Sequence, residues 1–144
     1  MGALASCGME NEMKTTNDRA AAELLGNPNF PAISYGGHRG LSRSEQPSLA
    51  ELKEDMKILH AMGIRFLRTY NVQLPHAGNV VKAIHELKQE DSNFEMYVML
   101  GAWIDCAGAW TDSPDHSVED SEANAQEIEL SLIHISEPTR HHVI

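Results

Sequence analysis

Side chains suited to holding a polar ligand stand at three points of the sequence, each at the end of a short apolar run. Tyr35 ends the first run, Arg68 and Tyr70 end the second, and Trp103 and Asp105 end the third. Tyrosine and tryptophan offer flat faces and hydroxyl or indole donors to sugar rings, and an arginine among aromatic residues can hold a carboxylate. Together the three points favour a carbohydrate-binding site.

Three of these residues also have a purely structural interpretation. Tyr35 can cap a barrel, Arg68 can pair with a buried carboxylate, and Trp103 can belong to the hydrophobic core. Arg68 and Tyr70 point to the same side of their run if it is a strand, because alternate strand residues share a face. A common site therefore requires that the three runs end side by side.

The runs at residues 32–35, 64–71 and 94–103 are predicted strands, and their starts lie about 30 residues apart, which is the step of a βα unit. Ser48 and Glu51 have the spacing of a capping box at the start of an intervening helix. Four apolar residues at helical spacing predict a second helix: Val80, Val81, Ile84 and Leu87. A third helix is expected to begin near residue 119, after a loop.

Strands that alternate with helices predict an α/β fold with a parallel sheet, either doubly wound or closed into a (β/α)8 barrel. The "GGHRG" segment at 36–40 follows a strand, but it lacks the spacing and the immediate helix of a dinucleotide-binding loop. We therefore expect residues 18–129 to form about three βα units, the N-terminal part of a truncated TIM barrel. Polar residues at the carboxyl ends of barrel strands form the active site.

Three segments, "GNPNFPAISYGGHRG", "LKEDMKILHAMGIRFLRTYN" and "FEMYVMLGAWIDCAGAW", resemble the N-terminal part of bacterial proteins of glycoside hydrolase family 17, the β-1,3-glucanase-like barrels. The resemblance covers roughly residues 26–129. It implies action on β-1,3-glucan or related β-linked glucose polymers, with retention of configuration. It also implies that Tyr35, Arg68, Tyr70 and Trp103 line the glycone side of the cleft. Asp105 is expected to hydrogen-bond the substrate or a residue close to it.

Catalytic residues are not predicted in this chain. Retaining glycosidases need two carboxyl groups about 5–5.5 Å apart, and in this family both are glutamates on later strands, the first in a Gly-Asn-Glu-like segment that does not occur here. The parent protein is expected to be a glycosidase, either hydrolase or transglycosylase, and this chain alone to be inactive. The alternative from another class is a non-catalytic carbohydrate-binding or cell-surface barrel protein.

Metals and other cofactors are not predicted, because the histidines lack ligand spacing. Cys106 is expected to be a partly buried thiol without a histidine partner. The net charge is −10, and residues 89–129 hold 11 acidic side chains and no lysine or arginine. This sign argues against nucleic acid as a partner, and the acidic residues are expected to form a solvated surface.

The two ends of the sequence carry separate expectations. Cys7 lies in "LASCG", which looks like a bacterial lipobox with an incomplete signal peptide. Residues 1–17 are therefore expected to be the remnant of a signal peptide and a lipoprotein tether. A lipid on Cys7 would be the only attachment to a membrane, and the protein is expected in the cell envelope. Residues 130–144 resemble the conceptual translation of a transposase-end sequencing adapter, so this tail is expected to be artefactual.

Overall fold

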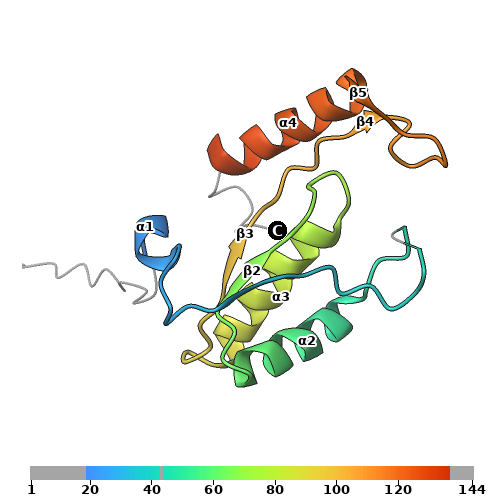
Figure 1. Ribbon diagram of the computed structural model, residues 1–144. Coiled ribbons are helices and arrows are strands. Elements are labelled where there is room, and N and C mark those ends of the chain that lie inside the picture. Colours follow the sequence, from blue (N-terminus) through green and yellow to red (C-terminus); the bar gives the residue numbers. More distant parts are fainter. Residues whose placement is uncertain (1–18, 43, 137–144) are drawn as a thin grey trace, which may run out of the picture.

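The computed structural model describes residues 19–42 and 44–136. Within them, three short parallel strands form one sheet in the order β1 (Ala32–Ser34), β2 (Phe66–Arg68), β3 (Tyr97–Met99), as Figure 1 shows. The prediction of an α/β fold with a parallel sheet is thereby confirmed. Cys7 and residues 137–144 lie outside the described part of the chain.

The strands are shorter than the apolar runs that predicted them. The sheet is centred on Leu67, which pairs with Ile33 of β1 and Val98 of β3. The hydrogen-bond ladder extends one residue beyond the assigned strands, since Tyr35 N–H donates to the Arg68 carbonyl at 2.9 Å and Thr69 N–H donates to the Met99 carbonyl at 3.0 Å. The three strands therefore end side by side, as a common site requires.

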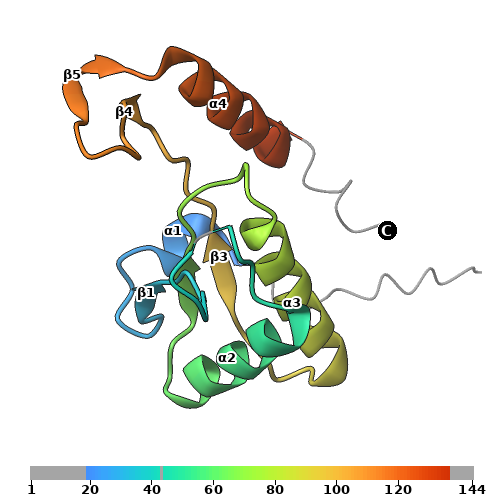
Figure 2. The ribbon, with the colours of Figure 1, turned by 90° about the vertical axis from the view of Figure 1, so that its right-hand side faces the viewer.

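Two helices, α2 (Leu49–Ala61) and α3 (His76–Glu90), pack on the same face of the sheet (Figure 2). The predicted capping box begins α2. Ser48 Oγ accepts a hydrogen bond from Glu51 N–H at 3.3 Å, and Glu51 Oε2 accepts one from Ser48 N–H at 2.8 Å. Both bonds satisfy N–H groups that have no partner within the helix itself.

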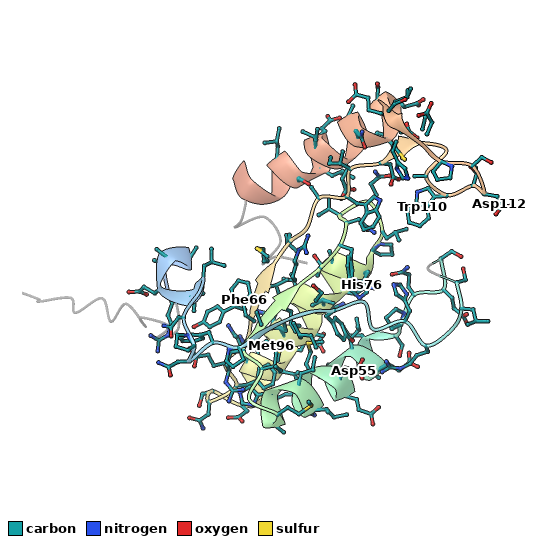
Figure 3. All side chains as sticks on the ribbon, in the orientation of Figure 1. Asp55, Phe66, His76, Met96, Trp110 and Asp112 are labelled. Atoms are coloured by element: carbon teal, nitrogen blue, oxygen red, sulfur yellow. The ribbon has the colours of Figure 1, made fainter. Side chains whose placement is uncertain are left out.

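The hydrophobic core lies between the sheet and these two helices. Its fully buried members include Leu52, Met56, Leu67 and Val80, and Met96, marked in Figure 3, belongs to the same cluster. Of the four apolar residues whose spacing predicted α3, Val81 does not belong to the buried face, because it is 37% exposed. One residue advances a helix by about 100°, which turns Val81 away from the face that Val80 occupies.

The third βα unit differs from the expected loop and helix. A small antiparallel hairpin, β4 (Cys106–Ala107) with β5 (Asp115–Glu119), interrupts the connection, and Gly108 adopts a φ of +66° just after β4. Helix α4 (Ser121–Ser136) follows, close to the predicted start. Figure 1 shows the hairpin and α4 beyond the carboxyl ends of the strands.

The opposite side of the sheet is sparsely covered in the described residues. The four-residue helix α1 (Ala21–Leu24) precedes β1, and Ala32, Ser34 and Met99, which alternate with the core-facing residues of their strands, are exposed. Each outer strand, β1 and β3, pairs along one edge only within the described part of the chain. In that part, no helix has both the length and the apolar character needed to cross a lipid bilayer.

Candidate functional site

A pocket of about 370 Å³ opens at the carboxyl ends of β2 and β3. Asn71 and Leu74 line it from the segment that joins β2 to α3. Trp103, Asp105 and Trp110 line it from the segment that follows β3. The volume lies within the range of small-molecule sites, and the combination of flat aromatic surface with a few polar groups is typical of them.

A row of aromatic rings runs along this edge of the sheet. The Tyr70 and Trp103 rings meet edge to face with centroids 6.3 Å apart, and the Trp103 and Trp110 rings lie 5.9 Å apart with 33° between their planes. Gly36, just after β1, lies against the Tyr70 ring, since a Cβ at this position would be 3.8 Å from Tyr70 Cε2. The row therefore reaches from the end of β1 to the hairpin.

Asp105 fixes the two tryptophans of the row. Its Oδ1 accepts a hydrogen bond from Trp103 Nε1, and its Oδ2 accepts one from Trp110 Nε1 at 2.7 Å. Figure 3 marks Trp110, on the stretch that leads towards the hairpin tip at Asp112. The indole of Trp110 is oriented although the residue is 66% exposed.

Helix α4 holds the pocket loops through the carboxylate of Glu127, which is fully buried. Its Oε1 accepts hydrogen bonds from Val72 N–H at 2.7 Å and Trp103 N–H at 3.0 Å, and its Oε2 accepts one from Gln73 N–H at 3.2 Å. One side chain thereby joins the segments after β2 and β3. Charge-assisted hydrogen bonds of this kind are among the strongest in proteins.

Sequence reasoning missed Glu127 because it counted this residue in an acidic, solvated surface. The sequence nevertheless contains a signal, because Asp120, Asn124 and Glu127 recur at helical spacing. In the structure, Asn124 and Glu127 are both buried. Polar residues on one helix face close to a predicted site indicate contacts with backbone groups. Trp110 was also missed, although it lies within one of the quoted segments.

Three of the five predicted site residues come together, and the other two lie apart from them. Tyr70, Trp103 and Asp105 come together at the pocket edge. Arg68 is exposed at the end of β2, and its side chain makes no hydrogen bond or ion pair with the described residues. Tyr35 lies buried on the helix side of the sheet instead.

The Tyr35 hydroxyl donates to Asp55 Oδ2 at 2.6 Å, and Arg39 Nη2 pairs with Asp55 Oδ1 at 2.8 Å. Burial, together with the neighbouring Asp55 carboxylate, raises the pKa of the Tyr35 hydroxyl far above its ordinary value. Burial opposes ionisation of Asp55, but hydrogen bonds from Arg39 and Tyr35 hold its pKa below the ordinary value. The three residues fix the loop that leads from β1 to α2.

His76, the first residue of α3, stacks against two rings. Its centroid lies 5.7 Å from that of Tyr35 and 5.4 Å from that of His38, and the residue is 5% exposed. Its Nε2 atom is buried without a hydrogen-bond partner among the described residues. Burial lowers the pKa of His76, and the nearby His38 lowers it further. The folded protein therefore favours a neutral imidazole here.

Acidification from about pH 7.5 to about 5.5 is expected to lower the free energy of unfolding. The unfolded chain takes up a proton on His76 as the pH falls through about 6.5, whereas the folded chain, whose pKa is depressed, does not. The stability present above this pH is thus lost below it, with a slope of at most about 1.4 kcal/mol per pH unit. Urea titrations at both pH values measure the slope. The His76→Phe variant should show a smaller slope, and an unchanged slope would contradict the assignment.

Cys106 has a histidine partner, contrary to expectation: its Sγ lies 3.3 Å from His116 Nδ1 across the hairpin. The two residues are ten apart in sequence, and only the unpredicted β4–β5 pairing brings them together. Within residues 19–42 and 44–136, no group of three or more histidine, cysteine or acidic side chains has a geometry that could hold a metal ion.

The chain has parallel βα units and an aromatic-lined pocket at the carboxyl edge of the sheet. It therefore belongs to the α/β proteins whose ligand-binding site lies at the carboxyl ends of the strands. No family model and no curated protein matches the chain. Among solved structures it is similar to the crystal structure of an endo-laminarinase from Formosa Hel1_33_131, with 59% sequence identity and a TM-score of 0.72. The match covers 83% of this chain and 31% of that one, so the chain spans about a third of the length of the enzyme. The similarity supports the β-glucanase relationship expected from the sequence.

Proposed function

We propose that this chain is the N-terminal part of a retaining glycoside hydrolase of the family 17 type, acting on β-1,3-glucan. The aromatic row of Tyr70, Trp103 and Trp110 beside the pocket carries the proposal. The 59% identity to an endo-laminarinase supports the substrate class. In the complete barrel these rings would form one wall of the glucan cleft.

The wall suits a glucose polymer because each pyranose ring has apolar C–H faces and a rim of hydroxyl groups. Tyr70 and Trp103 present ring surface to such faces, and the exposed guanidinium of Arg68 supplies several donors to hydroxyl oxygens. Tyr35 contributes indirectly, because the loop that it anchors contains Gly36, which lies against Tyr70.

The proposal assigns no catalytic residue to this chain. Both oxygens of Asp105 accept indole hydrogen bonds, and both oxygens of Glu127 accept backbone hydrogen bonds. These two carboxylates are therefore engaged in holding the pocket, and the acid/base and nucleophile would come from other strands of the barrel. The chain alone is expected to bind glucan and not to cleave it. The alternative, a barrel protein without catalytic activity, is not favoured, since the similar solved structure is that of an enzyme.

Substitution of Arg68 by alanine is expected to weaken binding of a β-1,3-linked glucose hexamer by roughly tenfold or more, because hydrogen bonds from a charged donor are lost. Isothermal titration calorimetry of the chain with the hexamer measures this change. Lys82→Ala removes an equal charge from an exposed position on α3 and serves as the matched control. Equal losses in both variants, or no binding by the unsubstituted chain, would count against the proposed function.

A cell-envelope location with lipid attachment at Cys7 stays a prediction of the sequence. It follows from the "LASCG" segment, which precedes the described residues. Mass spectrometry of the parent protein isolated from membranes would show a lipid-sized increment on the peptide that contains Cys7. An unmodified thiol there would overturn the prediction.

A further inference from the structure

We infer that Trp110 is a sugar-contacting residue of the glucan cleft and that Asp105 is a positioning residue that orients it. This inference rests on the proposed function and extends it, because it adds a ring at the hairpin end of the cleft and removes Asp105 from direct contact with sugar. Four observations carry the inference.

The first observation is that Trp110 is exposed and yet fixed. The residue is 66% exposed, but its indole N–H donates to Asp105 and its ring lies 5.9 Å from that of Trp103. Large exposed rings on a protein surface usually owe their exposure to a binding role when they gather into a patch. A ring that is oriented before the ligand arrives also loses little rotamer freedom on binding.

The second observation is that the backbone N–H and the backbone carbonyl of Asp105 are both hydrogen-bonded. Asn124, which is 5% exposed, accepts a hydrogen bond from Asp105 N–H at 2.7 Å and donates one to the Asp105 carbonyl at 3.0 Å. Asp120 N–H donates a third bond to the same carbonyl at 3.0 Å. A carboxylate anchored in this way can keep two indole rings in a fixed relative orientation.

The third observation concerns the hydrogen-bonding capacity of Asp105. Each carboxylate oxygen already accepts a charge-assisted bond from an indole N–H, and one of these partners, Trp103, is only partly exposed. A carboxylate oxygen can accept a second hydrogen bond, as Glu127 Oε1 does, but both Asp105 oxygens lie at the N–H edges of the two indole rings. The ring faces offer a sugar more contact area than these oxygens, and we therefore place the sugar on the rings.

The fourth observation is the position of the pocket, which both tryptophans line together with Asn71 and Gln73. A glucan residue in this pocket would meet both indole surface and side-chain amide groups. This is the mixture of apolar face and polar rim that a pyranose ring itself presents.

The test uses intrinsic fluorescence, because the chain contains two tryptophans, Trp103 and Trp110, and both belong to this unit. Titration with the β-1,3-linked glucose hexamer is expected to change the emission of the unsubstituted chain. The Trp110→Ala variant should bind about tenfold more weakly or worse. Trp110→Phe, which keeps a flat ring, should recover part of the affinity.

The role of Asp105 is tested by a double-mutant cycle on the dissociation constant. In Asp105→Asn, the single carbonyl oxygen should stay with the less exposed Trp103, so that Trp110 loses its anchor and binding weakens. The same substitution in the Trp110→Phe background should then have little further effect. Additive losses in the double variant would show that Asp105 contacts the sugar directly, and would overturn its positioning role.

The outcomes separate this inference from the proposed function. If the unsubstituted chain does not bind the hexamer, the proposed function fails. If the unsubstituted chain binds and Arg68→Ala weakens binding while Trp110→Ala does not, only the further inference fails. Circular dichroism and urea titration of each variant confirm that a loss of binding is not a loss of folding, and the hairpin position of Trp110 predicts near-normal stability.

Discussion

Replacement of Glu127 by glutamine is expected to lower the free energy of unfolding by roughly 3 kcal/mol. The fully buried carboxylate accepts three backbone hydrogen bonds, from Val72, Gln73 and Trp103. A side-chain amide has one acceptor oxygen, and its NH₂ group would point at an N–H donor. At least one buried donor then stays without a partner, which costs about 1–3 kcal/mol on its own.

Two measurements check this expectation. Urea titration gives the free energy of unfolding, and tryptophan emission reports whether Trp103 becomes more exposed when α4 detaches. Glu129→Gln changes the same chemical group at an exposed position of the same helix, and its effect should stay within about 0.5 kcal/mol. Similar stabilities of the two variants would mean that Glu127 does not connect α4 to the pocket loops.

Substitution of Gly101 by alanine is expected to cost at least about 3 kcal/mol and to disturb the aromatic row as well. A Cβ at this position would overlap the Thr69 carbonyl oxygen and lie 3.1 Å from the Tyr70 carbonyl oxygen. Both are backbone atoms, so no side-chain rotation relieves the contact. The ends of β2 and β3 would have to move apart. This movement would also stretch or break the hydrogen bond from Gly101 N–H to Thr69 Oγ1, which is 3.2 Å long.

Gly78→Ala is the matched control for this prediction. Gly78 lies in α3, and a Cβ there meets no atom within 4 Å. Alanine should therefore stabilise the helix by about 0.5–1 kcal/mol, since it restricts the unfolded chain and favours helical geometry. Thermal unfolding followed by circular dichroism should move the two variants in opposite directions, and a neutral Gly101→Ala variant would contradict the close approach of β2 and β3.

The repeating part of the fold could be predicted because short-range patterns determine it. The capping box at Ser48 and Glu51 and the apolar spacing of Val80, Ile84 and Leu87 each follow from local geometry, and all five residues lie where these patterns place them. The common position of the three strand ends could be predicted as well, because regular βα units bring successive carboxyl ends to one edge of the sheet. This is why Tyr70, Trp103 and Asp105 could be expected at a common site.

The hairpin and its consequences could not be predicted in the same way. Cys106 and Ala107 form only a two-residue strand, and their pairing with β5 depends on a turn through polar residues without alternating hydrophobicity. The partner of Cys106 and the position of Trp110 both follow from that pairing. Burial of Glu127 likewise depends on backbone N–H groups about 25 and 55 residues away in sequence, which no local pattern reveals.

Local patterns also could not predict on which face of the sheet the Tyr35 side chain lies. Alternation along β1 gives Tyr35 one of two directions, and both sides of the strand end offer polar partners. The ring lies on the helix side because Asp55 of α2 and His76 of α3 meet it there. The geometry of two packed helices decides this choice, and the strand sequence alone does not contain it.

The groups that hold the rings of Tyr70, Trp103 and Trp110 come from one continuous segment, from Tyr70 to Glu127. The positions of these rings therefore do not require any strand after this segment, although loops of about 25 and 55 residues must close to form the contacts. On a ribosome, where N-terminal segments emerge first, the rings, their anchoring aspartate and the helix that holds them could adopt their positions as a unit. The proposed sugar-binding wall would then be in place before the later strands of the proposed barrel are synthesised, and those strands would fold against a surface that already has its shape.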